Sequence, residues 1–312
     1  MKEINLVKEF KKKFSTKVNL KSLNLPVIFS QDKKNVLKAL NEKEISTYGK
    51  YSKIFEKELS KYLKSKHVIS LINGSSALQI AMLAAGINKK HEVLMPSFNY
   101  IAGANAVSKC GATPHFIDIE ENTLGICPAK LEKYLLDNTV KINGLTVNQK
   151  TKRNIKAILI LYTFGHPPKI QQIKKIAKKF NLMIIEDAAE ALGSFYKGKH
   201  AGTFGDLGIL SFNGNKIIST GGGGAIITKS NLIAKRVRKL TNNGKKNHRW
   251  KFIFDEKGFN YRLPSINASL GISQLKNLPK LIKRNRNLYL SYRFFFKKYK
   301  NIFLLTLVNF LI

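Results

Sequence analysis

The stretch GILSFNGNKIISTGGGGAIIT, residues 208–228, places Lys216 between an apolar run and four consecutive glycines. Lysine is abundant in this chain, so a single lysine is by default a solvated surface residue. Lys216 differs in its setting, because apolar residues flank it and the glycines at 221–224 permit close backbone packing. Burial disfavours the charged ammonium and leaves the amine able to attack an aldehyde. Lys216 is therefore a candidate nucleophile.

Around this stretch, helical patterns alternate with short apolar runs from residue 50 onward. The alternation predicts an α/β domain with a mostly parallel central sheet flanked by helices. We expect strands at 67–71, 92–95, 113–118, 155–161, 182–186 and 208–212, and the clearest helices at 51–63, 76–85 and 170–180. Residues 138–154 are polar without clean periodicity and predict a surface excursion. After Pro264 we expect a long helical segment that is broken near Pro279.

The length of 312 residues allows one large domain and a smaller piece. We expect an N-terminal segment at 1–30, a large domain at 31–264, and a linking helix with the start of a small C-terminal domain at 265–312. The first 14 residues are charged and amphipathic, unlike a secretory signal or a membrane anchor. The apolar end, residues 301–312, is shorter than the roughly 20 residues that a membrane-spanning helix needs.

Cysteine usage and charge narrow the function classes. Cys110 and Cys127 lack CxxC spacing, so we expect reduced thiols in a cytoplasmic protein without a metal site. The formal net charge is +36, from 55 Lys and Arg against 19 Asp and Glu. Such charge can indicate a nucleic-acid or membrane surface. The basic residues are scattered and form no Arg-rich block, which favours compositional drift toward lysine over either surface. The charge can still attract an anionic substrate.

Two polar stretches follow apolar runs, where ligands bind in open α/β sheets. The first is NGSSAL, residues 73–78, in which Gly74 allows a tight turn and the next helix offers N–H groups to a phosphate. Simple helix capping explains this stretch equally well.

The second stretch is LMIIEDAAEALGS, residues 182–194, where an apolar strand ends in Glu186 and Asp187. A buried carboxylate needs a cation, and a protonated pyridine nitrogen is one. The alternative reading is a helix N-cap. Asp187 is the better partner for a cation here, because strand alternation turns Glu186 to the opposite face.

With these motifs in order, the chain resembles the DegT/DnrJ/EryC1/StrS sugar aminotransferases, which are fold-type-I pyridoxal-phosphate enzymes. The resemblance covers about residues 30–290 and is carried by NGSSAL, PSFNYIAGANAV, CGATPHFIDIE, EDAAEALGS, GDLGILSFNGNK with its glycine run, and GFNYRLPSINASLGISQL. Three further stretches, SFNGNK, TLGICPAKLEKYL and HRWKFIFDEKGFNYRLP, are most similar to enzymes that aminate UDP-linked 4-keto-6-deoxy amino sugars of the legionaminic-acid or bacillosamine type.

The resemblance implies pyridoxal 5'-phosphate as cofactor and a role for each matching residue. Lys216 holds the cofactor and moves a proton between it and the sugar carbon, while Asp187 pairs with the pyridine nitrogen. The positions matched to the cofactor's phosphate, ring and hydroxyl are Gly74, Ser75 and Ser211 for the phosphate, Tyr100 for stacking and Glu190 for the hydroxyl face. Asn260 reaches the phosphate of the neighbouring subunit, so a homodimer with a shared active site is expected. From the residues alone, Tyr100 could be core and Glu190 a solvated helix residue.

Lys216 also indicates the reaction type, because relatives that dehydrate at C3 carry histidine at the matching position. The resemblance therefore implies transamination of a nucleotide-linked 4-keto-6-deoxy sugar with glutamate as donor, for surface polysaccharide or nonulosonic acid synthesis. GDP-linked 4-keto-6-deoxymannose is the rival substrate. The ending LVNFLI, residues 307–312, departs from the family and suggests an incomplete small domain. An inactive relative that retains the cofactor, and a basic nucleic-acid-binding protein, remain alternatives.

Overall fold

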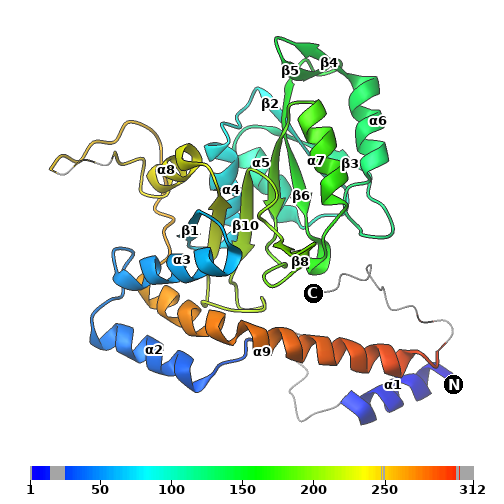
Figure 1. Cartoon of the computed structure of the whole chain (residues 1–312), viewed down its shortest axis with the longest axis vertical. Coiled ribbons are helices and arrows are strands. Elements are labelled where there is room, and N and C mark those ends of the chain that lie inside the picture. The colour runs from blue at the N-terminus through cyan, green and yellow to red at the C-terminus, as the bar shows by residue number, and fades with distance from the viewer. Residues whose placement is uncertain (1, 15–24, 247, 249, 300–301, 303–312) are drawn as a thin grey trace.

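The computed structural model describes residues 2–14, 25–246, 248, 250–299 and 302, with a twisted sheet at the centre and helices on both of its faces (Figure 1). Along the sheet the order is β1-β11-β10-β7-β6-β2-β3. These strands are β1 His67–Leu71, β2 His91–Pro96, β3 Thr113–Ile117, β6 Asn154–Leu161, β7 Met183–Asp187, β10 Leu207–Ser211 and β11 Gly224–Thr228.

Four neighbouring pairs of this sheet, from β3 through β2, β6 and β7 to β10, are parallel. Strand β11 runs antiparallel to both β10 and β1. The α/β class and the mostly parallel sheet are thus confirmed. The expected strands all form, within one or two residues at their ends, and β11 is added by the buried run that follows the four glycines. The sheet is consequently mixed.

Three apolar cores fix the helices on the sheet. The helices are α1 Lys2–Phe14, α2 Ser30–Asn41, α3 Lys50–Leu63, α4 Gly74–Ala84, α5 Ile101–Lys109, α6 Pro128–Asn138, α7 Ile170–Lys179, α8 Asn231–Leu240 and α9 Ser265–Phe296. Helices α4, α5 and α8 share one core with the sheet, and α6 and α7 share a second. A third core joins α3 and α9 to β10 and β11. Helices therefore cover both faces of the sheet.

The polar stretch 138–154 was expected to be a surface excursion, and most of its residues are exposed, but it has regular structure that the sequence did not indicate. It forms the antiparallel hairpin of β4 Thr139–Ile142 and β5 Leu145–Asn148, and β5 pairs with β6. The polar residues have a structural reason, because Asn148 and Thr151 donate hydrogen bonds of 2.9 and 2.6 Å to the buried carboxylate of Glu92. A buried carboxylate needs such donors.

The break expected near Pro279 is absent, since α9 runs through that proline as a single helix of 32 residues. Proline removes one backbone hydrogen bond and costs about 3 kcal/mol in a helix interior. Leu275, Leu278 and Leu281 are buried around it, and burying each of three leucine side chains stabilises the helix by roughly 2 kcal/mol. This packing outweighs the proline.

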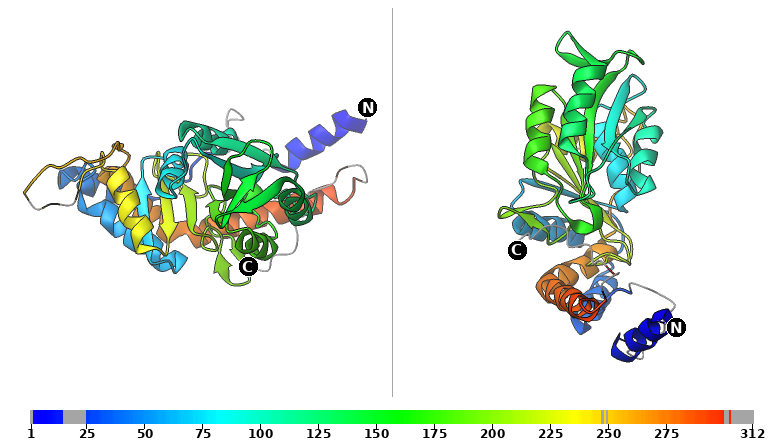
Figure 2. Two further views of the ribbon diagram at one scale, coloured as in Figure 1. Left: turned by 90° about the horizontal axis from the view of Figure 1, so that it is seen from above. Right: turned by 90° about the vertical axis from the view of Figure 1, so that its right-hand side faces the viewer.

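Helix α9 lies below the sheet and extends beyond it, and α1 lies beside its far half (Figures 1 and 2). Aromatic contacts join these two helices, with the Phe14 and Tyr292 ring centroids 4.8 Å apart. The domain limits at 30 and 264 stay predictions, and residues 303–312, including the unusual ending, lie outside the described residues. Within the described ranges, no helix combines the length and the apolar character that crossing a membrane requires.

Candidate active site

The phosphate-binding motif lies at the start of α4, directly after β1. Asn73 caps this helix, because its side-chain oxygen accepts a 2.7 Å hydrogen bond from the Ser76 N–H. The N–H groups of Gly74 and Ser75 have no acceptor in the described part of the chain. Free N–H groups at a helix N-terminus attract anions. Capping and phosphate binding, which the sequence left as alternatives, are therefore compatible.

Two glycines bring this helix start close to the sheet. A Cβ on Gly74 would lie 2.9 Å from the Cβ of Ser211, at the end of β10. A Cβ on Gly224, the residue paired with Ser211 in β11, would lie 2.6 Å from the carbonyl of Asn73. Both approaches are too close for a real Cβ. The glycines thus place the helix N-terminus against Ser211, as the expected close packing requires.

Asp187 ends β7 and is 4% exposed. Its carboxylate accepts a 3.1 Å hydrogen bond from the Ala189 N–H, and no ion pair holds it within the described ranges. Burial raises the pKa of Asp187 to about 6, against the Ala189 hydrogen bond and the charge of Lys216, which lower it. This carboxyl therefore lacks the close cation that would keep it fully ionised.

Glu186 points to the other face of the sheet, as alternation predicts. Its carboxylate accepts hydrogen bonds from the Tyr162 hydroxyl and the Gly202 N–H, the latter at 3.0 Å. Burial raises the pKa of Glu186, and these donors oppose the shift. Glu186 is thus a satisfied core residue and Asp187 the one available for a ligand.

The Lys216 amine pairs with the carboxylate of Glu190. The Lys216 side chain is 15% exposed and that of Glu190 46% exposed. Glu190 lies three residues beyond Asp187, and the charge of Lys216 acts on Asp187 as well. The structure therefore brings these three residues together from the ends of β7 and β10. Glu190 is an ion-pair partner rather than a solvated helix residue.

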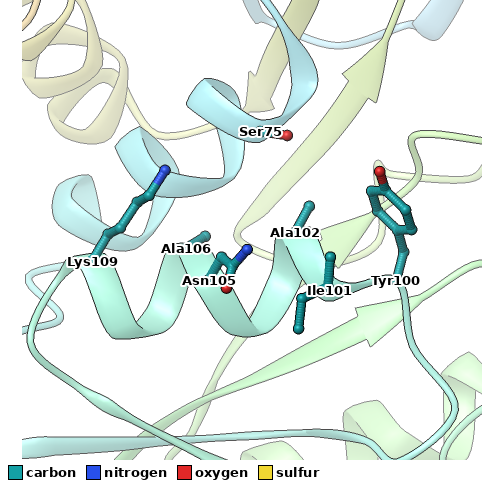
Figure 3. Close-up of a pocket in the computed structure, with 7 residues that line it drawn as sticks. All are labelled: Ser75, Tyr100, Ile101, Ala102, Asn105, Ala106 and Lys109. Carbon is teal, nitrogen blue, oxygen red and sulfur yellow. The ribbon is translucent and has the colours of Figure 1, made fainter.

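A pocket of about 160 Å³ lies between the start of α4 and α5, and Lys216, Glu190 and Asp187 are not among its lining residues (Figure 3). Its lining residues are Ser75, Tyr100, Ile101, Ala102, Asn105, Ala106 and Lys109. Tyr100, just before α5, is 71% exposed, which excludes a core role for this ring in the chain described here. Figure 3 shows Ser75 above α5, with Tyr100 and Lys109 toward opposite ends of that helix.

Asn260 stands apart from the other predicted residues. It is exposed, and its side chain forms no hydrogen bond with the described residues. The neighbouring Tyr261 carbonyl accepts a 2.9 Å hydrogen bond from the Ile72 N–H, so the segment lies near the phosphate turn of its own chain. The role of Asn260 toward a second subunit stays a prediction.

These residues fit pyridoxal 5'-phosphate on three counts. Asp187 is a buried carboxyl without a close cation, which a pyridinium nitrogen would supply. The unpaired N–H groups of α4, with the hydroxyls of Ser75 and Ser211 nearby, suit a phosphate. The mostly buried amine of Lys216 suits an aldehyde.

Two features of the site were missed from the sequence. Lys109 lines the pocket from the last turn of α5, and only helical spacing after Tyr100 could have indicated it. Phe164 adopts a left-handed backbone conformation with φ 50° at the end of β6, for which the sequence contains no reliable signal.

Comparison with known proteins agrees with this geometry. The chain is 36% identical over 263 residues to the GDP-perosamine synthase of Escherichia coli O157:H7, covering 84% of this chain and 68% of that protein. It is 38% identical over 242 residues to a UDP-4-amino-4,6-dideoxy-N-acetyl-beta-L-altrosamine transaminase of Campylobacter jejuni. This match covers 77% of this chain and 60% of that protein.

Among solved structures, Helicobacter pylori PseC, an aminotransferase of pseudoaminic acid biosynthesis, superposes with a TM-score of 0.78 at 29% identity, covering 89% of this chain and 71% of that one. The chain spans about two thirds of the length of the curated relatives it matches. The profile of one family, whose members use pyridoxal 5'-phosphate, matches residues 26–309. This chain belongs to the DegT/DnrJ/EryC1/StrS aminotransferase family.

Proposed function

We propose that this protein transfers an amino group from glutamate to C4 of a nucleotide-linked 4-keto-6-deoxy sugar. The observation that carries the proposal is the grouping of Lys216, Glu190 and Asp187 at the carboxyl ends of β7 and β10. One amine is held beside a carboxylate, and one buried carboxyl lacks a close cation. That combination suits an enzyme that binds an aldehyde cofactor with a basic ring nitrogen.

Each residue then has a defined task. Asp187 holds a proton on the ring nitrogen, and bound pyridoxal 5'-phosphate supplies an electron sink for the substrate carbon. With the cofactor bound, the Lys216 amine would move a proton at that carbon. Glu190 keeps the amine in place, while Gly74, Ser75 and Ser211 hold the phosphate and Tyr100 covers the ring.

For the substrate, we favour a UDP-linked N-acetylated sugar, and a GDP-linked sugar is the second candidate. Similarity to the Campylobacter jejuni transaminase supports the first, and similarity to GDP-perosamine synthases supports the second. Both names describe amino sugars attached to a nucleotide. The product would serve surface polysaccharide or nonulosonic acid synthesis in the cytoplasm.

We further propose a homodimer in which Asn260 of one subunit contacts the cofactor phosphate of the other. The exposed position of Asn260, without a side-chain hydrogen bond to the described residues, supports an external partner. Exposed Tyr100 beside the pocket supports a site that a neighbouring subunit helps to cover.

The test is reduction of the cofactor-loaded protein with borohydride, followed by peptide mapping, and then kinetics with both substrates. We expect the label on Lys216 and a higher kcat/KM for the UDP-linked sugar. Labelling of a different lysine would refute the assigned site, and a higher kcat/KM for the GDP-linked sugar would favour the second candidate.

A further inference from the structure

Two exposed phenylalanine rings meet beside the candidate site. Phe98 is 46% exposed and Phe164 is 68% exposed, and their centroids lie 6.3 Å apart in an edge-to-face arrangement. Phe98 follows β2 and Phe164 follows β6, which are neighbouring parallel strands. Strand β6 is next to β7, which ends at Asp187. The pair therefore lies at the same edge of the sheet as the catalytic candidates.

The backbone holds Phe164 in an unfavourable conformation. Its φ of 50° and ψ of 28° lie in the left-handed region, which a bulky side chain rarely adopts. Strain of this kind gathers at functional sites when the surroundings enforce it. The turn that contains Phe164 is closed by the Gly165 N–H, which donates a 2.9 Å hydrogen bond to the Tyr162 carbonyl. Gly165 also packs closely on Glu190, because a Cβ on it would lie 2.7 Å from the Glu190 carbonyl oxygen.

This packing links the ring to the reactive amine. Glu190 pairs with Lys216, and Gly165 packs on the backbone of Glu190. Phe164 is thus one residue from a direct contact of the Lys216 partner. The candidate phosphate-binding residues lie on the other side of β7, because Gly74 begins α4 directly after β1 and Ser211 ends β10. The aromatic pair consequently flanks the site opposite its anion-binding side.

We propose that Phe98 and Phe164 form an aromatic platform that contacts the apolar C–H face and the C6 methyl group of the keto sugar. This inference rests on the proposed function and names the part of the substrate that the two rings recognise. An exposed apolar surface of this kind favours the sugar over the charged diphosphate, because burying a charge against a ring without a partner is unfavourable. A 6-deoxy sugar carries a methyl group where other hexoses carry a polar hydroxymethyl group.

The first test replaces each ring with leucine, as Phe98→Leu and Phe164→Leu. Phe294→Leu serves as the matched control, because Phe294 is 74% exposed on α9. We expect the two platform variants to raise KM for UDP-4-keto-6-deoxy-N-acetylhexosamine about 3- to 10-fold, with little change in kcat. Conversion of the bound cofactor by glutamate alone, followed by its absorbance, should match the parent.

Three outcomes would overturn the platform. The first is an unchanged KM in both variants. The second is a loss of affinity for free UDP as large as the rise in KM, which would place the rings on the nucleotide. The third is loss of the dimer in sedimentation. If the parent turns over neither sugar nucleotide, the proposed function fails separately. In that case, calorimetry measures the affinity of the parent and of both leucine variants for UDP-4-amino-4,6-dideoxy-N-acetylhexosamine. We expect weaker binding in both variants, and unchanged binding would contradict the platform.

A second variant separates substrate contact from a structural role. Phe164→Asn introduces a residue that tolerates the left-handed conformation. We expect an unchanged or higher Tm together with a raised KM. A lower Tm with an unchanged KM would mean that the ring only stabilises the loop.

Discussion

The amine of Lys216 contacts the carboxylate of Glu190 near the ends of β7 and β10. Glu190 follows the buried Asp187 by three residues. Two carboxyl groups therefore lie near one amine, but they differ in burial. Glu190 is half exposed and forms the ion pair, whereas Asp187 is buried and its pKa is raised to about 6. This difference supports the proposal that Asp187, rather than Glu190, partners the cofactor's ring nitrogen.

Replacing Asp187 with asparagine should keep the cofactor bound and remove most turnover. The phosphate contacts persist, but a neutral amide no longer holds the proton on the ring nitrogen, so the electron sink weakens. Absorbance of the bound cofactor and steady-state kcat measure the two effects. If Asp187→Asn transaminates at the parental rate, another group is the partner of the ring nitrogen.

The same substitution should stabilise the cofactor-free protein, and more so at higher pH. Burial raises the pKa of Asp187 from 3.8 to about 6, so the unfolded chain releases this proton at lower pH than the folded chain. The parent therefore loses stability as pH rises from about 4 to 6 and keeps the whole penalty above that range. We expect Asp187→Asn to gain on the order of 3 kcal/mol at pH 7.

Urea unfolding of both cofactor-free proteins at pH 5 and pH 7 measures this gain. It should be clearly smaller at pH 5, since the parental carboxyl is then mostly protonated. An equal gain at both pH values would mean that Asp187 does not titrate between them.

The approach of Gly74 to Ser211 makes a separate prediction. Gly74→Ala should weaken cofactor binding, because the new Cβ would lie 2.9 Å from the Ser211 Cβ and must push the start of α4 away. We expect roughly a tenfold rise in the cofactor Kd, equivalent to about 1.4 kcal/mol. Adding Ser211→Gly removes the opposing Cβ and should restore the position of the helix. If the loss of binding free energy in the double variant equals or exceeds the sum of the losses in the two single variants, this steric cause is contradicted.

The shared active site can be tested by mixing subunits. In a heterodimer of Lys216→Ala and Asn260→Ala chains, one site carries both defects and the other carries neither. Activity should therefore rise above that of either parental variant, toward one intact site per dimer. With heterodimers confirmed by mass, an absence of any rise would mean that each chain builds its own site.

The sequence predicted the sheet and most of its helices because the apolar periodicity of those segments is strong. It missed β11 as a strand, since glycine-rich runs weaken strand signals, although its residues are fully buried. The hairpin at 139–148 was missed because its polar residues serve a buried Glu92, a partner distant in sequence. Pro279 suggested a break because local propensity says nothing of the leucines that hold α9.

The candidate site was predicted in part. Motifs after strand ends located Lys216, Asp187 and Ser75, because the edge where ligands bind follows from parallel strand order. The pairing of Lys216 with Glu190 depends on the loops after β7 and β10, which local patterns do not position. The left-handed Phe164 precedes Gly165, which packs on Glu190, and local sequence patterns reveal neither the conformation nor this contact between distant segments.

The most direct test of the central claim follows nitrogen from donor to sugar. The protein with pyridoxal 5'-phosphate is incubated with ¹⁵N-glutamate and a UDP- or GDP-linked 4-keto-6-deoxy sugar, with Lys216→Ala as the control. We predict a nucleotide sugar that carries ¹⁵N at C4, formed by the parent and not by the variant. A sugar without ¹⁵N from the cofactor-loaded parent, or the same labelled product from Lys216→Ala, would contradict the account.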